Sequence, residues 1–219
     1  MKKENPMTAL DYKKVHKNLY QPKTEPSLIK VPMSTCIMVE GKGDPNTSES
    51  YKEAVELLYA LSYTIKMGLK KDEKPFGYVD YVVFPLEGLW WFNEEVFDGR
   101  VKERKDDFNW IMMILQPDFV TEDIFNTALN KVRNKKPSLD SSKAVFKRFE
   151  EGLCAQIMHM GAYDDEPATI AKLDAFIALQ GYRTEMSGLR QHHEIYLSDP
   201  RKCAAEKLKT IIRHPIIHK

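Results

Sequence analysis

A short internal repeat is the feature that most constrains how this chain folds. Residues 37–44 (Ile-Met-Val-Glu-Gly-Lys-Gly-Asp) align without a gap on residues 157–164 (Ile-Met-His-Met-Gly-Ala-Tyr-Asp) at an offset of 120 positions, and Ile, Met, Gly and Asp coincide. Such a match indicates that two copies of one structural unit follow each other along the chain. Because short matches also occur by chance, the order of elements after each copy decides between duplication and coincidence.

Each copy continues through a turn rich in Gly, Asp and Pro into an amphipathic helix. In the first copy, residues 50–53 (Ser-Tyr-Lys-Glu) have the capping-box pattern, and apolar residues recur at helical spacing as far as Ile65. In the second copy, Glu166 precedes Pro167, which suits a first helical position, and Gly181 is placed to end the helix. The shared order favours duplication.

Strand candidates follow both helices. They are Tyr78–Phe84 and Asn109–Leu115 in the first half, and His192–Leu197 and Leu208–Arg213 in the second. The predicted unit is therefore β-α-β-β, used twice, and the predicted fold class is α+β. Two such units can pair edge to edge into one antiparallel sheet that carries both helices on one face.

The segments outside the two copies are predicted to precede or to connect them. Thr121 is a predicted N-cap with acidic residues in the next turn, which indicates a helix between the copies. Two prolines separate a short helix at 8–20 from the first strand. The predicted boundaries are an N-terminal extension at 1–30 and a single domain at 31–219, made of repeats at about 31–116 and 146–215 joined by a helical connection at 117–145.

Charge, hydropathy and cysteine usage exclude several classes of function. A formal net charge of +1 gives no global attraction to nucleic acid or to an anionic membrane. No apolar run approaches the ~20 residues that span a bilayer, and residues 1–10 lack the apolar stretch of a secretory signal. The three cysteines are scattered without a CxxC pair, which favours a reduced, cytoplasmic protein. We therefore expect neither specific nucleic acid nor membrane among its partners.

The local distribution of charge is uneven. Residues 150–200 hold nine Asp or Glu against three Lys or Arg, whereas both ends of the chain are basic. One interpretation is that these charged side chains lie on faces of the protein that are exposed to water. The alternative is that the acidic middle segment biases a site toward cationic or electron-poor ligands.

The strand candidate at 192–197 has one polar face. Ile195 and Leu197 alternate with His192, Glu194 and Tyr196, and Ser-Asp-Pro closes the segment. Strands disfavour a carboxylate at a central position, and here two rings flank it on its own face. This arrangement is typical of a sheet whose second face lines a binding cleft.

Five sequence blocks together resemble the stand-alone branch of the GyrI-like superfamily. The blocks are GKGDPN at 41–46, PLEGLWW at 85–91, QPDFVT at 116–121, GAYDDEP at 161–167 and HEIYLSDPR at 193–201. The resemblance extends from about residue 8 to the C-terminus. It implies a sheet of pseudo-twofold symmetry, curved around a ligand cleft on the face opposite the helices.

The resemblance also implies a function. In multidrug-responsive transcription regulators the module is the effector-binding domain, where an acidic residue and aromatic side chains hold bulky cationic compounds. Some members of the stand-alone branch hydrolyse cyclopropane-bearing toxins that alkylate DNA. Since the sequence carries no helix-turn-helix region, we do not expect a regulator.

Glu194 and Tyr163 are the predicted catalytic residues. The resemblance places the acidic residue of the cleft at Glu194, where it is expected to act as a counter-ion or as a general base toward water. The alternative is an edge-strand charge that faces water. Tyr163, which corresponds to Gly43 in the first copy, is expected to hydrogen-bond a ligand or to donate a proton, and the alternative is a packed tyrosine in a turn.

A further set of residues is predicted to bind the ligand. The set consists of Trp91, Trp90, Trp110, Met113, Tyr81, His192 and Tyr196. Trp90 and Trp91 must point to opposite faces of an extended segment. Because Trp90 continues the alternation that includes Leu86 and Gly88, Trp91 is narrowly favoured as the residue that faces the cleft. Glu87 is expected in an exposed turn after Pro85.

No metal and no cofactor are predicted. His192 and His193 point to opposite faces of one strand, and His159 and Glu194 lack the helical i, i+4 spacing of zincin ligands. The sequence is thus interpreted as a protein that binds bulky aromatic or cationic small molecules in an acidic, aromatic-lined cleft, with hydrolysis of cyclopropanoid electrophiles as the favoured activity. A non-catalytic module that sequesters drugs or binds effectors is the alternative. The sequence assigns no oligomeric state.

Overall fold

The two halves of the chain fold into units of the same order. A computed structural model describes residues 9–71, 74–92 and 105–219, so residues 1–8 of the predicted extension lie outside the described part. The first unit consists of β1 (Ser27–Val31), β2 (Ser34–Lys42), α3 (Glu49–Lys71), β3 (Leu86–Trp91) and β4 (Asn109–Gln116). The second consists of β5 (Val145–Phe149), β6 (Gly152–Met160), α5 (Glu166–Leu179), β7 (Tyr182–Thr184), β8 (His192–Tyr196) and β9 (Lys209–His218).

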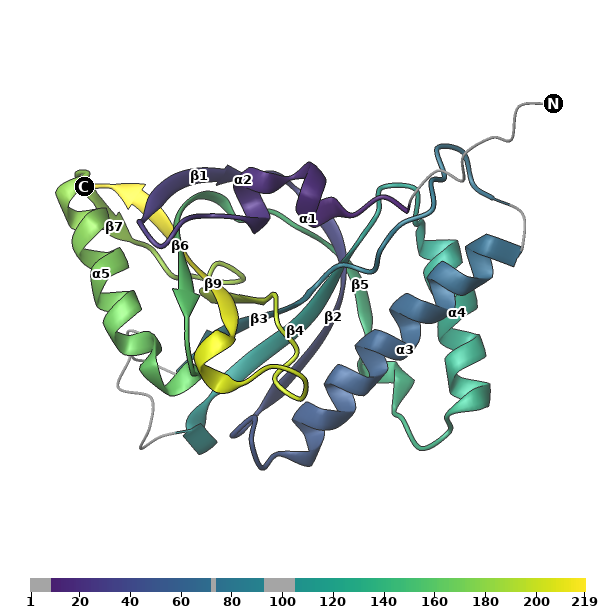
Figure 1. Cartoon of the computed structure of the whole chain (residues 1–219). Helices are drawn as coiled ribbons and strands as arrows, with labels where there is room; N and C mark the ends of the chain where they lie inside the picture. Colours follow the sequence, from purple (N-terminus) through teal and green to yellow (C-terminus); the bar gives the residue numbers. More distant parts are fainter. Residues whose placement is uncertain (1–8, 72–73, 93–104) are drawn as a thin grey trace.

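The remaining elements precede, connect or lie within the two units (Figure 1). They are the helices α1 (Tyr12–Val15), α2 (Lys17–Tyr20) and α4 (Glu122–Lys135), and the single turns η1 (Lys105–Asp107), η2 (Ser141–Lys143), η3 (Tyr163–Asp165) and η4 (Ala205–Lys207). The predicted helical connection between the halves contains α4. None of the described helices is both long and apolar enough to cross a membrane.

The strands of both units form one antiparallel sheet of pseudo-twofold symmetry. The described residues give nine strands, eight of them in the order β1-β6-β9-β8-β3-β4-β2-β5, with β7 paired to β9. Exchanging each strand for its counterpart in the other unit reverses this order, so the symmetry axis passes between β3 and β8. The predicted α+β fold, built by duplication, is confirmed.

The first unit contributes one strand more than the predicted β-α-β-β, namely β1, and the second contributes two, namely β5 and β7. The additional strands β1 and β5 cross to the other half, where β1 pairs with β6 and β5 pairs with β2. The sheet therefore includes residues 27–30 of the predicted extension. Because each half completes the sheet of the other, neither can bury its edge strand alone.

One predicted strand was misplaced. Residues 78–84 do not form a strand, apart from a bridge between Leu10 and Tyr81, and the chain pairs instead at 86–91. Apolar side chains of 78–84 pack against neighbouring segments of the core. Their strand-like sequence pattern therefore arises from burial, and beyond that bridge the backbone of this segment forms no hydrogen-bonded strand pair with the described residues. Glu87, expected in an exposed turn, lies in β3 and is 2% exposed.

The helix starts follow local capping rules. Thr121 caps α4 as predicted, since its hydroxyl accepts a hydrogen bond from the Ile124 amide at 3.4 Å. The cap of α3 lies two residues earlier than expected: the hydroxyl of Ser48, not that of Ser50, accepts from the Tyr51 amide at 3.3 Å. Boundary shifts of this size are usual for helix ends.

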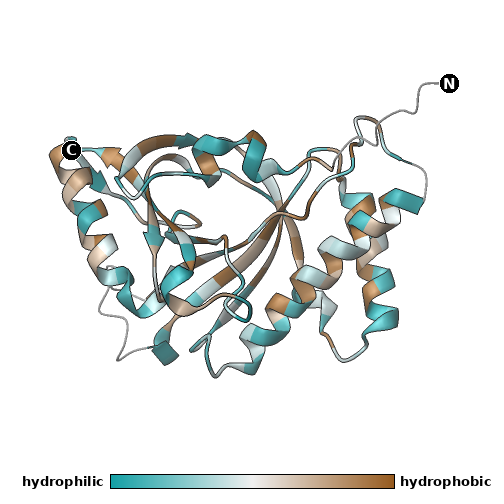
Figure 2. Cartoon of the chain, in the orientation of Figure 1, coloured by the Kyte–Doolittle hydropathy of each residue, from teal (hydrophilic) through white to brown (hydrophobic). Residues whose placement is uncertain are grey.

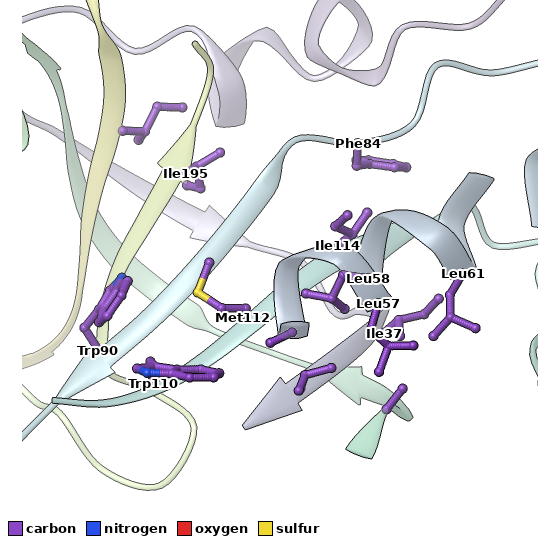
Figure 3. Packing of buried hydrophobic residues seen from close by; sticks show 14 of the residues in the cluster. Ile37, Leu57, Leu58, Leu61, Phe84, Trp90, Trp110, Met112, Ile114 and Ile195 are labelled. Atoms are coloured by element: carbon purple, nitrogen blue, oxygen red, sulfur yellow. The ribbon is translucent and has the colours of Figure 1, made fainter. Parts of the chain in front are cut away.

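Both repeat helices pack on the same face of the sheet. Helix α3 contacts β2 and β4, while α5 contacts β6 and β7. Figure 3 shows Leu57, Leu58 and Leu61 of α3 over Ile37 and Ile114, and Figure 2 shows the hydrophobic character of the central strands. Burying one such side chain contributes ~1.5–3 kcal/mol, so this layer is the main source of stability.

The close packing of Trp110 on Gly41 leads to a first prediction. The two residues are paired across β2 and β4, and a Cβ at Gly41 would lie 2.2 Å from the Trp110 ring. Gly41→Ala should therefore lower the free energy of unfolding by ~1–3 kcal/mol, the usual cost of overpacking. Urea unfolding measures this, with Glu40→Ala at the exposed neighbouring position as the control. Equal stability of both variants would show that the indole does not lie over Gly41.

The face of the sheet opposite α3 and α5 buries a network of four charged side chains, which we call the ion network: Glu87, Glu151, His193 and Arg213. His193 Nδ1 lies 3.1 Å from Glu151 and its Nε2 lies 3.0 Å from Glu87. Arg213 donates to Glu151 at 3.1 Å, and Tyr20 donates to Glu87 at 3.2 Å. The two acids and two bases balance in charge, as a buried group of ions must.

The ion network shifts the pKa of its members in opposite directions. Burial disfavours the charged form of His193, but the carboxylates of Glu151 and Glu87 overcome it and raise the pKa to about 9. Burial likewise opposes ionisation of Glu151, but His193 and Arg213 lower its pKa to about 2. Both groups are therefore charged at neutral pH.

Candidate functional site

A large cavity lies between α3 and α5, over the seam where β3 meets β8. Its volume is about 990 Å³, at the upper end of the range for small-molecule sites. Residues of both helices and of both strands line it. A cleft was expected on the face opposite the repeat helices, whereas this cavity lies on the face that carries α3 and α5. The helices cover the outer strands of each unit and leave the central seam open between them, while the opposite face is filled by the ion network and apolar side chains.

Glu194 lies on the cavity wall, held by hydrogen bonds from two neighbours on its own strand. The Tyr196 hydroxyl donates to Oε2 at 2.7 Å, and His192 Nε2 lies 3.1 Å from Oε1. Trp90 of β3 donates from its indole nitrogen to the Tyr196 oxygen at 3.0 Å. The alternation of β8 places these polar groups on the cavity face, as the sequence predicts. The side chain of Glu194 is 13% exposed, so it does not belong to a solvated edge.

Glu166 is a second carboxyl group beside Glu194, and the sequence analysis missed it. It is the first residue of α5 and is buried. Burial and the adjacent charge of Glu194, with which it shares a hydrogen bond, raise the pKa of Glu166 well above its ordinary value. The available signal was an acidic residue before Pro167, which was interpreted only as a helix start.

The carboxyl pair carries one negative charge at neutral pH. Burial opposes ionisation of Glu194, but hydrogen bonds from His192, Tyr196 and Glu166 lower its pKa. Burial lowers the pKa of His192, which is therefore neutral. Thus Glu166 holds the proton, Glu194 is ionised, and no formal cation hydrogen-bonds to Glu194 among the described residues. The site has the charge of a base or of a counter-ion for a cationic ligand.

Tyr163 lies at the same cavity, in the turn η3 that precedes α5. It is 37% exposed, and its ring meets the ring of Tyr196 edge-on with 5.8 Å between centroids. Burial and the charge of Glu194 raise the pKa of Tyr163 to about 12. The phenol therefore keeps its proton at neutral pH and is available as a donor.

The predicted ligand-binding residues divide into two groups. Trp90, Tyr196 and the backing residue His192 belong to the cavity wall or support it. Trp91, Trp110, Met113 and Tyr81 do not line the cavity. The narrow preference for Trp91 was wrong because β3 turns the face that carries Leu86 and Trp90 toward the helices. Trp91 and Met113 lie on the opposite face.

Trp110 and Tyr81, the other two predicted residues that do not line the cavity, are buried in the core. Trp110 is buried against Tyr51, whose ring meets it edge-on at 5.4 Å between centroids. Tyr81 is buried against Phe119. Both face helices of the core, so their aromatic character serves packing in this structure.

Aromatic residues of α3 complete the wall, and the sequence analysis did not select them. Tyr51, Val55, Tyr59 and Tyr63 line the cavity, and they recur at intervals of four residues. That spacing places them on one side of the helix, beside the apolar stripe that packs on the sheet. A tyrosine stripe next to the core stripe is the signal that could have identified this wall.

One cluster has a composition that also suits a metal ion. Candidate ligand atoms of Glu166, His192 and Glu194 lie within 4.8 Å of one another. Both ring nitrogens of His192 already have partners, Glu194 on one side and His214 on the other, and Glu166 shares a proton with Glu194. Hydrogen bonds within the protein therefore explain why these three side chains lie close together. The sequence-based expectation of no metal and no cofactor stays a prediction.

The comparisons with known proteins point to one family. The family model of the GyrI-like small molecule binding domain matches residues 24–217. A structure of an uncharacterized conserved protein from Listeria innocua is similar at 46% identity and a TM-score of 0.87, covering 95% of this chain and all of that one. A hydrolase from Listeria innocua is 43% identical over 95% of this chain and all of its own, with a TM-score of 0.84.

A more distant structure shares the fold alone. The EcmrR C-terminal domain is 12% identical, covers 89% of this chain and 98% of that domain, and has a TM-score of 0.54. Comparison with curated proteins gave no match.

Proposed function

Because the chain belongs to the GyrI-like small molecule binding domain family, we propose that its cavity binds bulky aromatic or cationic compounds and hydrolyses strained, cyclopropane-bearing electrophiles. The family expected from the five sequence blocks is thus confirmed, and small-molecule binding is its general property. The ligand class and the reaction are our proposal. DNA-alkylating toxins that carry a cyclopropane ring conjugated to a carbonyl group are the proposed substrates.

The observation that carries this proposal is the charge state of the carboxyl pair. An ionised Glu194 has its proton-bearing partner Glu166 beside it and a protonated Tyr163 at the same cavity. A base and a proton donor at one apolar cavity are what the addition of water to an electrophile requires. Aromatic walls supply the contact area that a large flat ligand needs.

The proposed reaction is the addition of one water molecule across the strained ring. The water oxygen bonds to the ring carbon and its proton passes to the carboxylate of Glu194. The cyclopropane C–C bond breaks, and its electron pair moves through the conjugated system onto the carbonyl oxygen. Tyr163 donates a hydrogen bond and then a proton to that oxygen. A positioned general base contributes on the order of 10²–10⁴-fold, which is useful for a substrate already activated by strain.

The hydrolase from Listeria innocua supports an enzymatic role. It is 43% identical and covers nearly the whole of this chain. The free cysteines Cys36, Cys154 and Cys203 support the proposed cytoplasmic location. Specific nucleic acid and membrane are not among the partners that we propose.

A non-catalytic binding module is the second candidate. The same ionised carboxylate and aromatic walls favour it, since a counter-ion and stacking surfaces suffice to hold a flat cation without any chemistry. Such a protein would sequester toxic compounds.

Incubation with two classes of compound distinguishes the candidates. We expect mass spectrometry to detect a cyclopropanoid alkylator with one water added, at a rate above that in buffer. Binding of rhodamine 6G, a flat aromatic cation, should quench tryptophan fluorescence. Trp90→Phe should lose most of that quenching, whereas Trp91→Phe, on the other face of β3, should retain it. Binding without product selects the module, and neither binding nor product refutes the proposal.

A further inference from the structure

A continuous chain of hydrogen bonds leads from the cavity to the solvent through the interior of the second unit. Glu194 Oε1 lies 3.1 Å from His192 Nε2, and His192 Nδ1 lies 2.8 Å from His214 Nε2. His214 Nδ1 lies 3.1 Å from Oδ1 of Asp174 on α5. Both imidazoles are fully buried, whereas the side chain of Asp174 is 47% exposed.

The three hydrogen bonds permit two proton arrangements with the same number of protons. In the first, Glu194 is ionised, His192 carries its proton on Nε2, and His214 is protonated on both nitrogens. In the second, Glu194 is protonated, His192 carries its proton on Nδ1, and His214 keeps only the proton toward Asp174. Moving one proton across each of the two inner hydrogen bonds converts one arrangement into the other. Imidazole can do this because one ring nitrogen accepts while the other donates.

We infer that His192, His214 and Asp174 form a proton relay that connects Glu194 with the solvent while a ligand fills the cavity. The inference extends the proposed function, since it supplies an exit for the proton that Glu194 takes from water. A bound ligand would separate Glu194 and the attacking water from the bulk solvent, so the cavity cannot serve as this exit. Tyr163, at the exposed mouth, can regain its proton directly.

The surroundings of the two imidazoles favour this path. The ionisable groups that face them among the described residues are Glu194 on β8, and Glu166 and Asp174 on α5. His193, next in sequence, points to the ion network on the other face of the sheet. Asp174 is the only one of these groups that is exposed, so a proton that leaves Glu194 through the relay reaches the solvent at Asp174. His192, His214 and Asp174 are positioning residues, because none of them needs to touch the ligand.

Asp174→Asn tests the relay at its exposed end. The amide keeps the size of the side chain and can still accept a hydrogen bond from His214, but it does not take up a proton. If the protein turns over a cyclopropanoid alkylator, kcat should fall about tenfold with KM unchanged, a smaller loss than removal of the base itself. Asp123→Asn, at an exposed position of α4, is the matched control and should leave kcat unchanged.

A second measurement needs no turnover and so separates the relay from the proposed hydrolysis. In protein labelled with ¹⁵N-histidine, Asp174→Asn should shift the ring-nitrogen resonances of both His214 and His192, with and without bound rhodamine 6G. Asp123→Asn should shift neither. A change confined to His214, or an unchanged kcat in Asp174→Asn, would overturn the relay even in an active enzyme. Shifts at both histidines without any hydrolysis would retain the relay and remove the proposed reaction.

Discussion

Glu151→Gln is expected to lower the free energy of unfolding by about 3–5 kcal/mol, the usual cost of breaking a buried ion pair. The carboxylate of Glu151 is fully buried and accepts hydrogen bonds from His193 and Arg213, both at 3.1 Å. An amide of the same shape would leave two buried cations with only Glu87 to balance them. The loss should appear as a lower urea midpoint, followed by tryptophan fluorescence.

The neighbouring residue provides a matched control. Glu150 is exposed, and Glu150→Gln should stay within about 0.5 kcal/mol of the wild type. Similar stability of the two variants would mean that the ion network does not hold the sheet together. A large loss confined to Glu151→Gln would support the network as the polar core of the face opposite α3 and α5.

The ion network also predicts how stability depends on pH. The pKa of His193 is raised to about 9, so its contribution is complete below about pH 6.5 and is lost as the pH rises toward 9. That contribution is on the order of 3 kcal/mol. Glu151, with a pKa of about 2, contributes fully above about pH 4.5 and loses its contribution as the pH falls toward 2. The raised pKa of Glu166 adds a further loss as the pH rises from about 4.5, its ordinary value, through the raised pKa. Glu151→Gln should flatten the loss between pH 6.5 and 9, as measured by urea unfolding at each pH.

Glu194→Gln is expected to reduce hydrolysis of a cyclopropanoid alkylator by about 10²-fold or more, with little change in melting temperature. The amide keeps the shape and the hydrogen bond from Tyr196, but it has neither the negative charge nor the basicity of the carboxylate. Affinity for rhodamine 6G should fall as well, because the buried counter-ion is gone. Product analysis by mass spectrometry and a dye titration measure the two effects.

Glu166→Gln is the informative comparison, since Glu166 is assigned the proton of the pair. An amide resembles a neutral carboxyl group, so this variant should retain most of the dye affinity and lose less turnover than Glu194→Gln. Equal losses in both variants would contradict the assignment of the charge to Glu194. A Glu194→Gln protein that melts far below the wild type, or that binds and turns over as well as it, would show that the site lies elsewhere.

Local patterns in the sequence were sufficient for much of the fold. The match between residues 37–44 and 157–164 predicted a duplicated unit, and Thr121 predicted the start of α4. The alternation around Glu194 predicted that His192 and Tyr196 share its face. The helix start and the shared face depend on residues close together in the chain, where helix and strand periodicity and capping operate, and the repeat is visible by comparing two such local patterns. Residues 78–84 show the limit of this reasoning, because burial against the core produced a strand-like pattern without a strand.

The sequence by itself therefore determined the duplication, the order of elements and the polar face of β8. Only the tertiary structure decided that β1 and β5 cross to the other half, that the cavity opens between α3 and α5, and that Trp90 faces it. It also decided the chemistry of the site, since Glu166 meets Glu194 only when the N-terminal end of α5 lies beside β8. The physical reason is that pKa values and pairing partners depend on distances between segments far apart in sequence, which no local pattern records.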